Sequence, residues 1–131
     1  MNTYKILNMF TSVLFLYLFY VLLFDAASFF IDIEVDAGEA AYVLARRASI
    51  LMIGIAVLLF LSKNLQHSDA RQIIIIATTV IMLGFATMGT YELVRGNVGK
   101  AILTAIIVES VVGISYLIVF FSNRNLIIDE N

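Results

Sequence analysis

The stretch AILTAIIVESVVGISYLIVFF, residues 101–121, contains a single charged side chain, Glu109, close to its middle. A helix rises about 1.5 Å per residue, so roughly 20 apolar residues cross a hydrocarbon core of about 30 Å. This stretch is therefore predicted to be a transmembrane helix. A carboxylate at that depth is costly unless it has a partner or a function, which makes Glu109 the first candidate site residue.

The rest of the chain repeats this apolar pattern. The 131 residues are 62% hydrophobic and 14% charged, which is more apolar side chain than a soluble domain of this size buries. A soluble helical core would also show polar faces, and the apolar runs at 51–61 and 73–76 show none. Together with residues 101–121, three stretches of similar length are predicted to be transmembrane helices: 6–24, 40–61 and 73–93.

The predicted fold class is therefore all-α, an integral membrane four-helix bundle formed by one domain over residues 1–131. Short connections favour up-down-up-down topology, with sequence neighbours adjacent in space. The segment RGNVG, residues 95–99, is typical of a tight turn and makes the last two helices an antiparallel hairpin. The apolar core of the first stretch is longer than that of a signal peptide, so we expect an uncleaved helix.

The distribution of Lys and Arg indicates an orientation. The connection between the first two helices carries five acids and no Lys or Arg, whereas residues 62–72 carry Lys63 and Arg71. Cytoplasmic loops are enriched in Lys and Arg, so both termini and residues 62–72 are predicted to be cytoplasmic, in a bacterial inner membrane. Arg95 and Lys100 fall on the opposite side of the membrane, which disagrees with this assignment.

The acidic first connection invites a calcium interpretation. Asp32, Glu34 and Asp36 alternate as in a calcium-binding EF-hand loop. However, Gly38 falls one place late and Val43 stands where the closing glutamate belongs. The pattern favours a solvated acidic loop without a metal. The apolar residues that alternate with these acids predict a short extended or interfacial piece.

Arg46 and Arg47 lie inside the second apolar stretch, where they match Glu109 in height. At about 1.5 Å per residue, Arg47 is about 21 Å above the cytoplasmic end of its helix and Glu109 about 18 Å above its own. We therefore predict a buried polar cluster in which Arg47 pairs with Glu109 and Arg46 with Glu92, nearer the outer surface. The exchanged pairing remains open.

Small residues surround this cluster. Ala105 and Gly113 flank Glu109 at helical spacing, which lets a neighbouring helix approach closely. Three more glycines are predicted to pack helices in the same way: Gly54, Gly84 and Gly89. Two interpretations stay open: a structural ion pair that sets helix register, or a polar pocket for a ligand or a proton, lined by Tyr91 and Tyr116.

Several functional classes are disfavoured. The chain has no Cys, and its one histidine, His67, lies in a connection, so neither a metal nor a cofactor is expected. No nucleophile–base pair is present, which argues against an enzyme, including a lipid-modifying or quinone-linked one. A net charge of -2 does not indicate the basic surface that binding of nucleic acid requires.

The segment ARRASILMIG, residues 45–54, together with the size and the four spans, resembles small bacterial membrane proteins of the broad DoxX-like grouping. The resemblance implies a four-helix membrane fold. The first helix has neither the arginine nor the following glycine expected of DoxX proper, so no functional residue is carried over.

Together these patterns predict a non-enzymatic membrane protein that lies in the lipid bilayer. We expect it to form a homo-oligomer or to serve as an accessory subunit for another membrane protein. The alternative is an oligomeric transporter or channel for an ion or small molecule, which would use the Arg/Glu cluster near a subunit interface.

Overall fold

The computed structural model of this chain describes residues 2–128, within which it contains helices and no strand. Four helices are long, α1 (Thr3–Phe24), α3 (Glu39–Ser62), α4 (Asp69–Val94) and α5 (Ile102–Ile128), and one is short, α2 (Ala26–Asp32). The candidate spans in the long helices have mean hydropathies of 2.1, 2.1, 2.1 and 2.3 and are long enough to cross a membrane. The predicted all-α fold with four transmembrane helices is confirmed.

The ends of the helices follow local capping chemistry. Asn2 caps α1 by accepting a hydrogen bond from the Tyr4 backbone N–H at 3.2 Å. Ser68 accepts one from the Arg71 N–H at 3.3 Å, so α4 begins at Asp69 rather than at the predicted residue 73. The apolar run identified the transmembrane part of α4, but the prediction missed the polar first turn of this helix.

The connection between α1 and α3 differs from the prediction. Residues 26–32 form helix α2, which was not predicted, and the residues expected to form an extended or interfacial piece lie at its end and just after it. The apolar residues Ala26, Phe29 and Phe30 recur at helical spacing, and the Phe30 ring packs against Tyr42 of α3 with 5.8 Å between centroids. This helical spacing precedes the two-residue alternation that begins at Ile31, and packing on α3 favours the helix.

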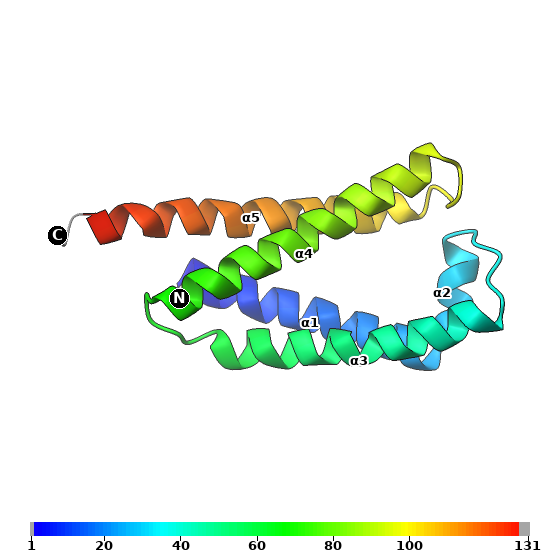
Figure 1. Ribbon diagram of the computed structural model, residues 1–131, viewed down its shortest axis with the longest axis horizontal. Helices are drawn as coiled ribbons and strands as arrows, with labels where there is room; N and C mark the ends of the chain where they lie inside the picture. The colour runs from blue at the N-terminus through cyan, green and yellow to red at the C-terminus, as the bar shows by residue number, and fades with distance from the viewer. Residues whose placement is uncertain (1, 129–131) are drawn as a thin grey trace.

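The long helices form two antiparallel hairpins, α1 with α3 and α4 with α5 (Figure 1). The hairpins meet mainly through α1 and α5, while α3 and α4 are not among the pairs that pack along their length. The prediction that each long helix packs against the next one in the sequence is therefore wrong for α3 and α4. The first residues of α1 and the end of α5 lie at one end of the bundle, here called the terminal end, and α2 lies at the other, the α2 end.

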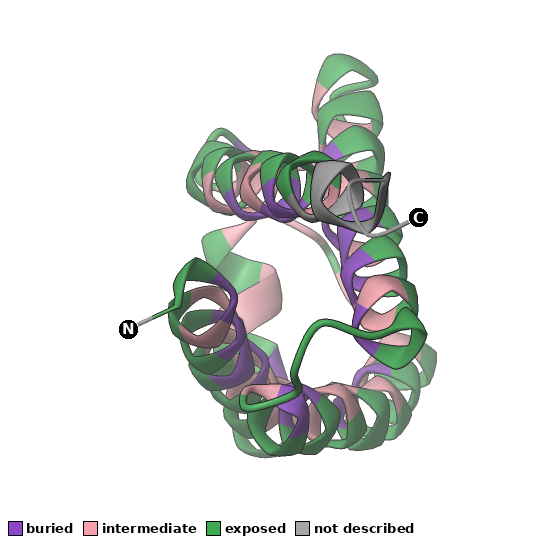
Figure 2. Cartoon of the chain, turned by 90° about the vertical axis from the view of Figure 1, so that its left-hand side faces the viewer, coloured by how far each residue is buried: buried purple, intermediate pink, exposed green. Residues whose placement is uncertain are grey.

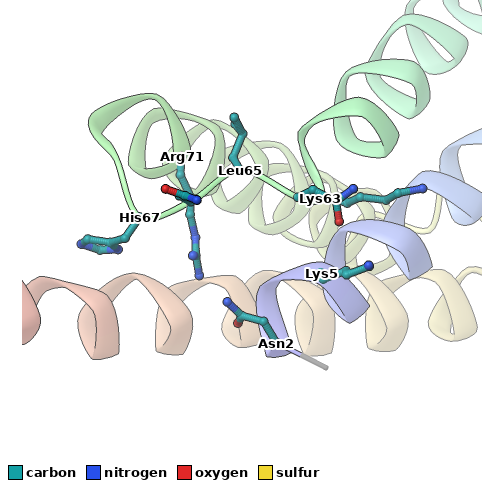
Figure 3. A pocket seen from close by; sticks show the side chains of 8 residues that line it. Asn2, Lys5, Lys63, Leu65, His67 and Arg71 are labelled. Atoms are coloured by element: carbon teal, nitrogen blue, oxygen red, sulfur yellow. The ribbon is translucent and has the colours of Figure 1, made fainter.

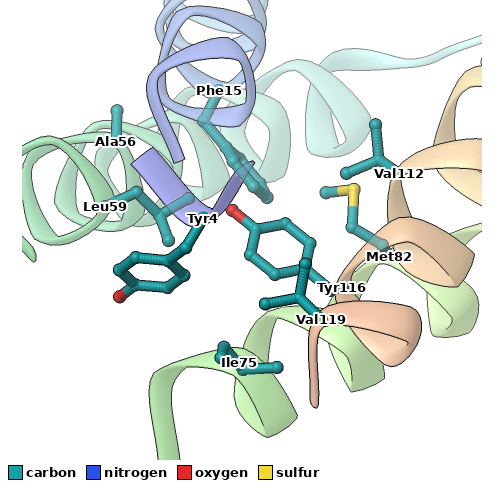
Figure 4. Close-up of a cluster of buried hydrophobic side chains, with 9 residues drawn as sticks. All are labelled: Tyr4, Phe15, Ala56, Leu59, Ile75, Met82, Val112, Tyr116 and Val119. Atoms are coloured by element: carbon teal, nitrogen blue, oxygen red, sulfur yellow. The ribbon is translucent and has the colours of Figure 1, made fainter. Parts of the chain in front are cut away.

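The ribbon segments of buried residues lie on the inner sides of the four long helices (Figure 2). The core is concentrated in the half of the bundle nearer the terminal end, where Phe15, Tyr116 and Met82 come together from three helices (Figure 4). Large apolar side chains cover the outside of every long helix, as expected of surfaces that contact lipid.

A polar network crosses this core. Asn8 of α1 is fully buried, and its amide nitrogen donates to Ser62 Oγ at 3.0 Å and to the Leu59 carbonyl at 3.3 Å. The Tyr116 hydroxyl donates to Asn8 Oδ1 at 2.8 Å. Nearby, Ser12 Oγ donates to the Ala56 carbonyl at 2.7 Å. Asn8 thus connects α1 with both α3 and α5.

At the α2 end the two hairpins are held together by their connections. The Gly99 N–H donates to the Ile33 carbonyl at 2.7 Å. A Cβ at Gly99 would collide with the side chain of Glu34, so glycine permits this close approach. Apart from this contact, the helices at this end leave space between them.

Candidate functional site

Two adjoining cavities, of about 480 and 360 Å³, occupy the space between the hairpins at the α2 end. Glu109 of α5 lies in the wall of both, and we call the combined space the Glu109 cleft. Its shared wall comes from α1, α2, α4 and α5 and consists of Leu18, Phe29, Phe85, Ile102, Ala105 and Glu109. The cleft is therefore mostly apolar, with its carboxylates and the side chains of Tyr17 and Thr104 as polar parts of the wall.

Those carboxylates have no cationic neighbour in the cleft. Asp32 lines the larger cavity and Glu92 the smaller one, while no Lys, Arg or His is among the described residues of either wall. The Glu92 carboxylate accepts a hydrogen bond from Asn97 Nδ2 at 2.5 Å. Glu109 is partly buried against apolar side chains. An apolar cavity with a carboxylate in its wall is suited to an apolar group that carries a positive charge or a hydrogen-bond donor.

The predicted Arg/Glu cluster is not assembled within one chain. Arg46 and Arg47 are exposed on α3 and line neither cavity. Arg47 lies eight residues after Glu39 at the start of α3, and Glu109 seven after Ile102 at the start of α5. Height along a helix says nothing about the direction in which a side chain points, and α3 does not pack along α5. The predicted pairs with Glu109 and Glu92 are therefore wrong for a single chain.

The exposed arginines belong to a continuous surface of α3, which we call the arginine face. All of its members are exposed: Val43, Leu44, Arg46, Arg47, Ile50 and Leu51. The arginines lie about 10 Å from the start of the helix. At this depth a guanidinium in lipid either extends toward the membrane surface or meets an anionic partner.

Of the two tyrosines predicted to line a pocket, Tyr91 lines a cavity of about 410 Å³ between α4 and α5, separate from the Glu109 cleft. Tyr116 is fully buried in the core, where its hydroxyl binds Asn8. Tyr91 is exposed, and its hydroxyl accepts a hydrogen bond from Arg95 Nη1 at 2.9 Å. Neither residue lines the Glu109 cleft.

The predicted packing residues divide into two groups. A Cβ built on Gly113 would lie 2.6 Å from Leu83 Cδ2, and one on Gly89 would lie 3.0 Å from Ile106 Cγ1, so these glycines allow α4 and α5 to approach closely. A Cβ on Gly54 or Gly84 would meet nothing within 4 Å, so these two pack against no other helix of the described chain. Ala105 lies in the wall of the cleft.

Several cleft residues were missed in the sequence. Phe29 and Asp32 lie on α2, which was not predicted to be a helix, and Met52 and Met88 are single apolar residues within uniformly apolar stretches. The helical spacing of Ala26 with Phe29 and Phe30 was the signal that could have predicted α2.

Comparison with known proteins adds no function. No family model, curated protein or solved structure matches this chain. The DoxX-like resemblance therefore stays a prediction. Within residues 2–128 no three His, Asp or Glu side chains are grouped closely enough to hold a metal ion.

Proposed function

We propose that this is a non-enzymatic membrane protein that self-associates, with the arginine face of one copy against carboxylates of a second copy. The observation that carries the proposal is the exposure of Arg46 and Arg47 within a transmembrane helix. Each arginine at membrane depth costs about 2.5–3.5 kcal/mol on translocon-insertion scales. A carboxylate on a neighbouring chain offsets much of that cost.

Charge and height support a second copy as the partner. Copies inserted in the same direction place equivalent residues at the same depth, so Arg46 and Arg47 of one chain meet the level of Glu109 in the other. Glu109 and Glu92 have no cationic neighbour in the walls of their own cleft. Met52 of α3 and Met88 of α4 line the smaller cavity. A second copy therefore reaches the carboxylates between α3 and α4, the two helices that do not pack along their length.

Self-association can be measured by single-molecule photobleaching in proteoliposomes. We expect wild-type protein to dimerise, and Arg46→Gln/Arg47→Gln to weaken the association at least tenfold, because the interface loses two ion pairs per copy. The matched control is Arg95→Gln/Lys100→Gln, which removes two exposed charges outside the arginine face and should leave the association unchanged. A monomeric wild type, or equal association of the two variants, would contradict self-association through this face.

A second candidate function is transport of a lipophilic cation, and the apolar walls and carboxylates of the Glu109 cleft favour it. Wild-type protein is then expected to bind tetraphenylphosphonium, and Glu109→Gln to weaken binding about tenfold through loss of the opposite charge. Equilibrium dialysis in detergent measures the affinity. Glu39→Gln serves as the control, since Glu39 is exposed and lines neither cavity.

The two candidates compete for the same carboxylate. If a second copy supplies an arginine to Glu109, a cation is excluded, and Arg46→Gln/Arg47→Gln should increase tetraphenylphosphonium binding. If neither the wild type nor this variant binds tetraphenylphosphonium, the transport candidate is wrong. The first proposal requires that the wild-type protein dimerises and does not bind tetraphenylphosphonium.

A further inference from the structure

A second pocket lies at the terminal end, far from the Glu109 cleft (Figure 3). Its volume is about 480 Å³, and it is formed by the start of α1, the connection after α3 and the first turn of α4. The lining residues are mostly polar: Asn2, Lys5, Lys63, Asn64, Leu65, Gln66, His67 and Arg71. Three cationic side chains and no described carboxylate line this pocket, so its chemistry is that of an anion site.

Arg71 is the central observation. It is only 4% exposed, and its guanidinium lies over the ring of Tyr4 with 4.2 Å between Cζ and the ring centroid. The buried Nε has no hydrogen-bond partner among residues 2–122, whose side chains the structure describes. A buried charged donor without a partner is costly, whereas an anion in the pocket would satisfy it. The stacking on Tyr4 holds the planar guanidinium in place before an anion arrives.

Each element around the pocket supplies one cation. Lys5 lies on the first turn of α1, and Lys63 directly follows α3, where its Nζ is 3.2 Å from the centroid of the Phe60 ring. Arg71 lies in the first turn of α4, whose N-terminal end carries a partial positive charge. The bundle therefore brings three positive charges from distant parts of the sequence to one pocket.

We infer that this pocket binds a phosphate group with a net negative charge at the membrane surface, as in an anionic headgroup and unlike the phosphate of phosphatidylcholine, which its own choline ammonium neutralises. A phosphate accepts several hydrogen bonds at once, and the combination of an arginine fork with lysine ammonium groups is well matched to it. The pocket lies at the ends of the transmembrane helices, the level at which phospholipid headgroups lie. The phosphate belongs either to the headgroup of an anionic phospholipid or to a small soluble phosphate.

The test measures binding of phosphatidylglycerol and phosphatidylcholine to the full chain in a neutral detergent by native mass spectrometry. Wild-type protein is expected to prefer phosphatidylglycerol about tenfold. Lys5→Gln/Lys63→Gln should reduce that preference about tenfold, since each cation near the surface strengthens anionic-lipid binding several-fold. Both lysines lie at the rim rather than in the core, so this variant keeps the fold in which Arg71 is buried.

Arg95→Gln/Lys100→Gln is the matched control, because it removes the same charge at the α2 end and should change the preference less than twofold. Inorganic phosphate then separates the two sources. If millimolar phosphate displaces phosphatidylglycerol, the pocket recognises phosphate alone; if it does not, the lipid chains contribute, and both results support the inference. Equal binding of the two lipids, or equal losses in the two double variants, would overturn it.

Discussion

Asn8→Leu is expected to lower the free energy of unfolding in a membrane or detergent by about 2 kcal/mol. The substitution keeps a side chain of similar shape but removes three hydrogen bonds that connect α1 with α3 and α5. Individual interhelical hydrogen bonds in membrane proteins contribute about 0.6 kcal/mol on average and up to about 1.7. The Tyr116 hydroxyl would in addition stay buried without its acceptor.

Unfolding by sodium dodecyl sulfate, followed by circular dichroism, measures this loss. Tyr116→Phe removes one of the three hydrogen bonds and should cost less than Asn8→Leu. Thr87→Val is the control, because Thr87 is exposed and its hydroxyl bonds only the Leu83 carbonyl of its own helix. If Asn8→Leu unfolds at the same detergent fraction as wild type, the network does not stabilise the bundle.

Gly113→Leu is expected to destabilise the α4–α5 hairpin by about 1–3 kcal/mol, the usual cost of forcing extra methylenes into a packed interface. Even the first added carbon would lie 2.6 Å from Leu83 Cδ2 and 3.3 Å from Met82 Cβ, so α4 and α5 would have to move apart. The same unfolding measurement reports the effect.

Gly84→Leu is the matched control for this prediction. Gly84 lies on the partner helix α4, is exposed, and has nothing within 4 Å of a built Cβ. Because leucine also favours helix over glycine by roughly 0.5–1 kcal/mol, this variant should be as stable as wild type or more so. Equal destabilisation by the two substitutions would show that the hairpin is not packed through Gly113.

These glycines illustrate what the sequence determines and what it does not. Four apolar stretches were enough to predict the transmembrane helices, because crossing a bilayer sets their length and composition. Gly84 and Gly113 have similar apolar surroundings in the sequence, and only the rotation of each helix decides which one meets a neighbour. The hydrophobic pattern of a transmembrane helix carries little information on that rotation, since lipid and core are both apolar.

The positions of the charged residues were likewise predictable from the sequence only in part. Counting residues predicted that Arg47 and Glu109 lie at the same height and pair, but in the structure α3 and α5 do not pack along each other. By contrast, the predicted up-down-up-down topology puts the start of the chain and residues 62–72 at one end of the bundle, where Lys5, Lys63 and Arg71 line one pocket. Their convergence on one pocket required the tertiary structure, because they come from three separate elements.

The hydrogen bond between Tyr116 and Asn8 joins residues 108 positions apart, which has a consequence for biosynthesis. Helices α1 and α3 are synthesised first, so the Asn8 amide nitrogen finds Ser62 and Leu59 while α5 has yet to be made. Its amide oxygen gains the Tyr116 hydroxyl only when the last helix inserts. A chain that stops short of α5 therefore keeps the Asn8 amide oxygen within the bilayer without the hydrogen bond that Tyr116 donates to it.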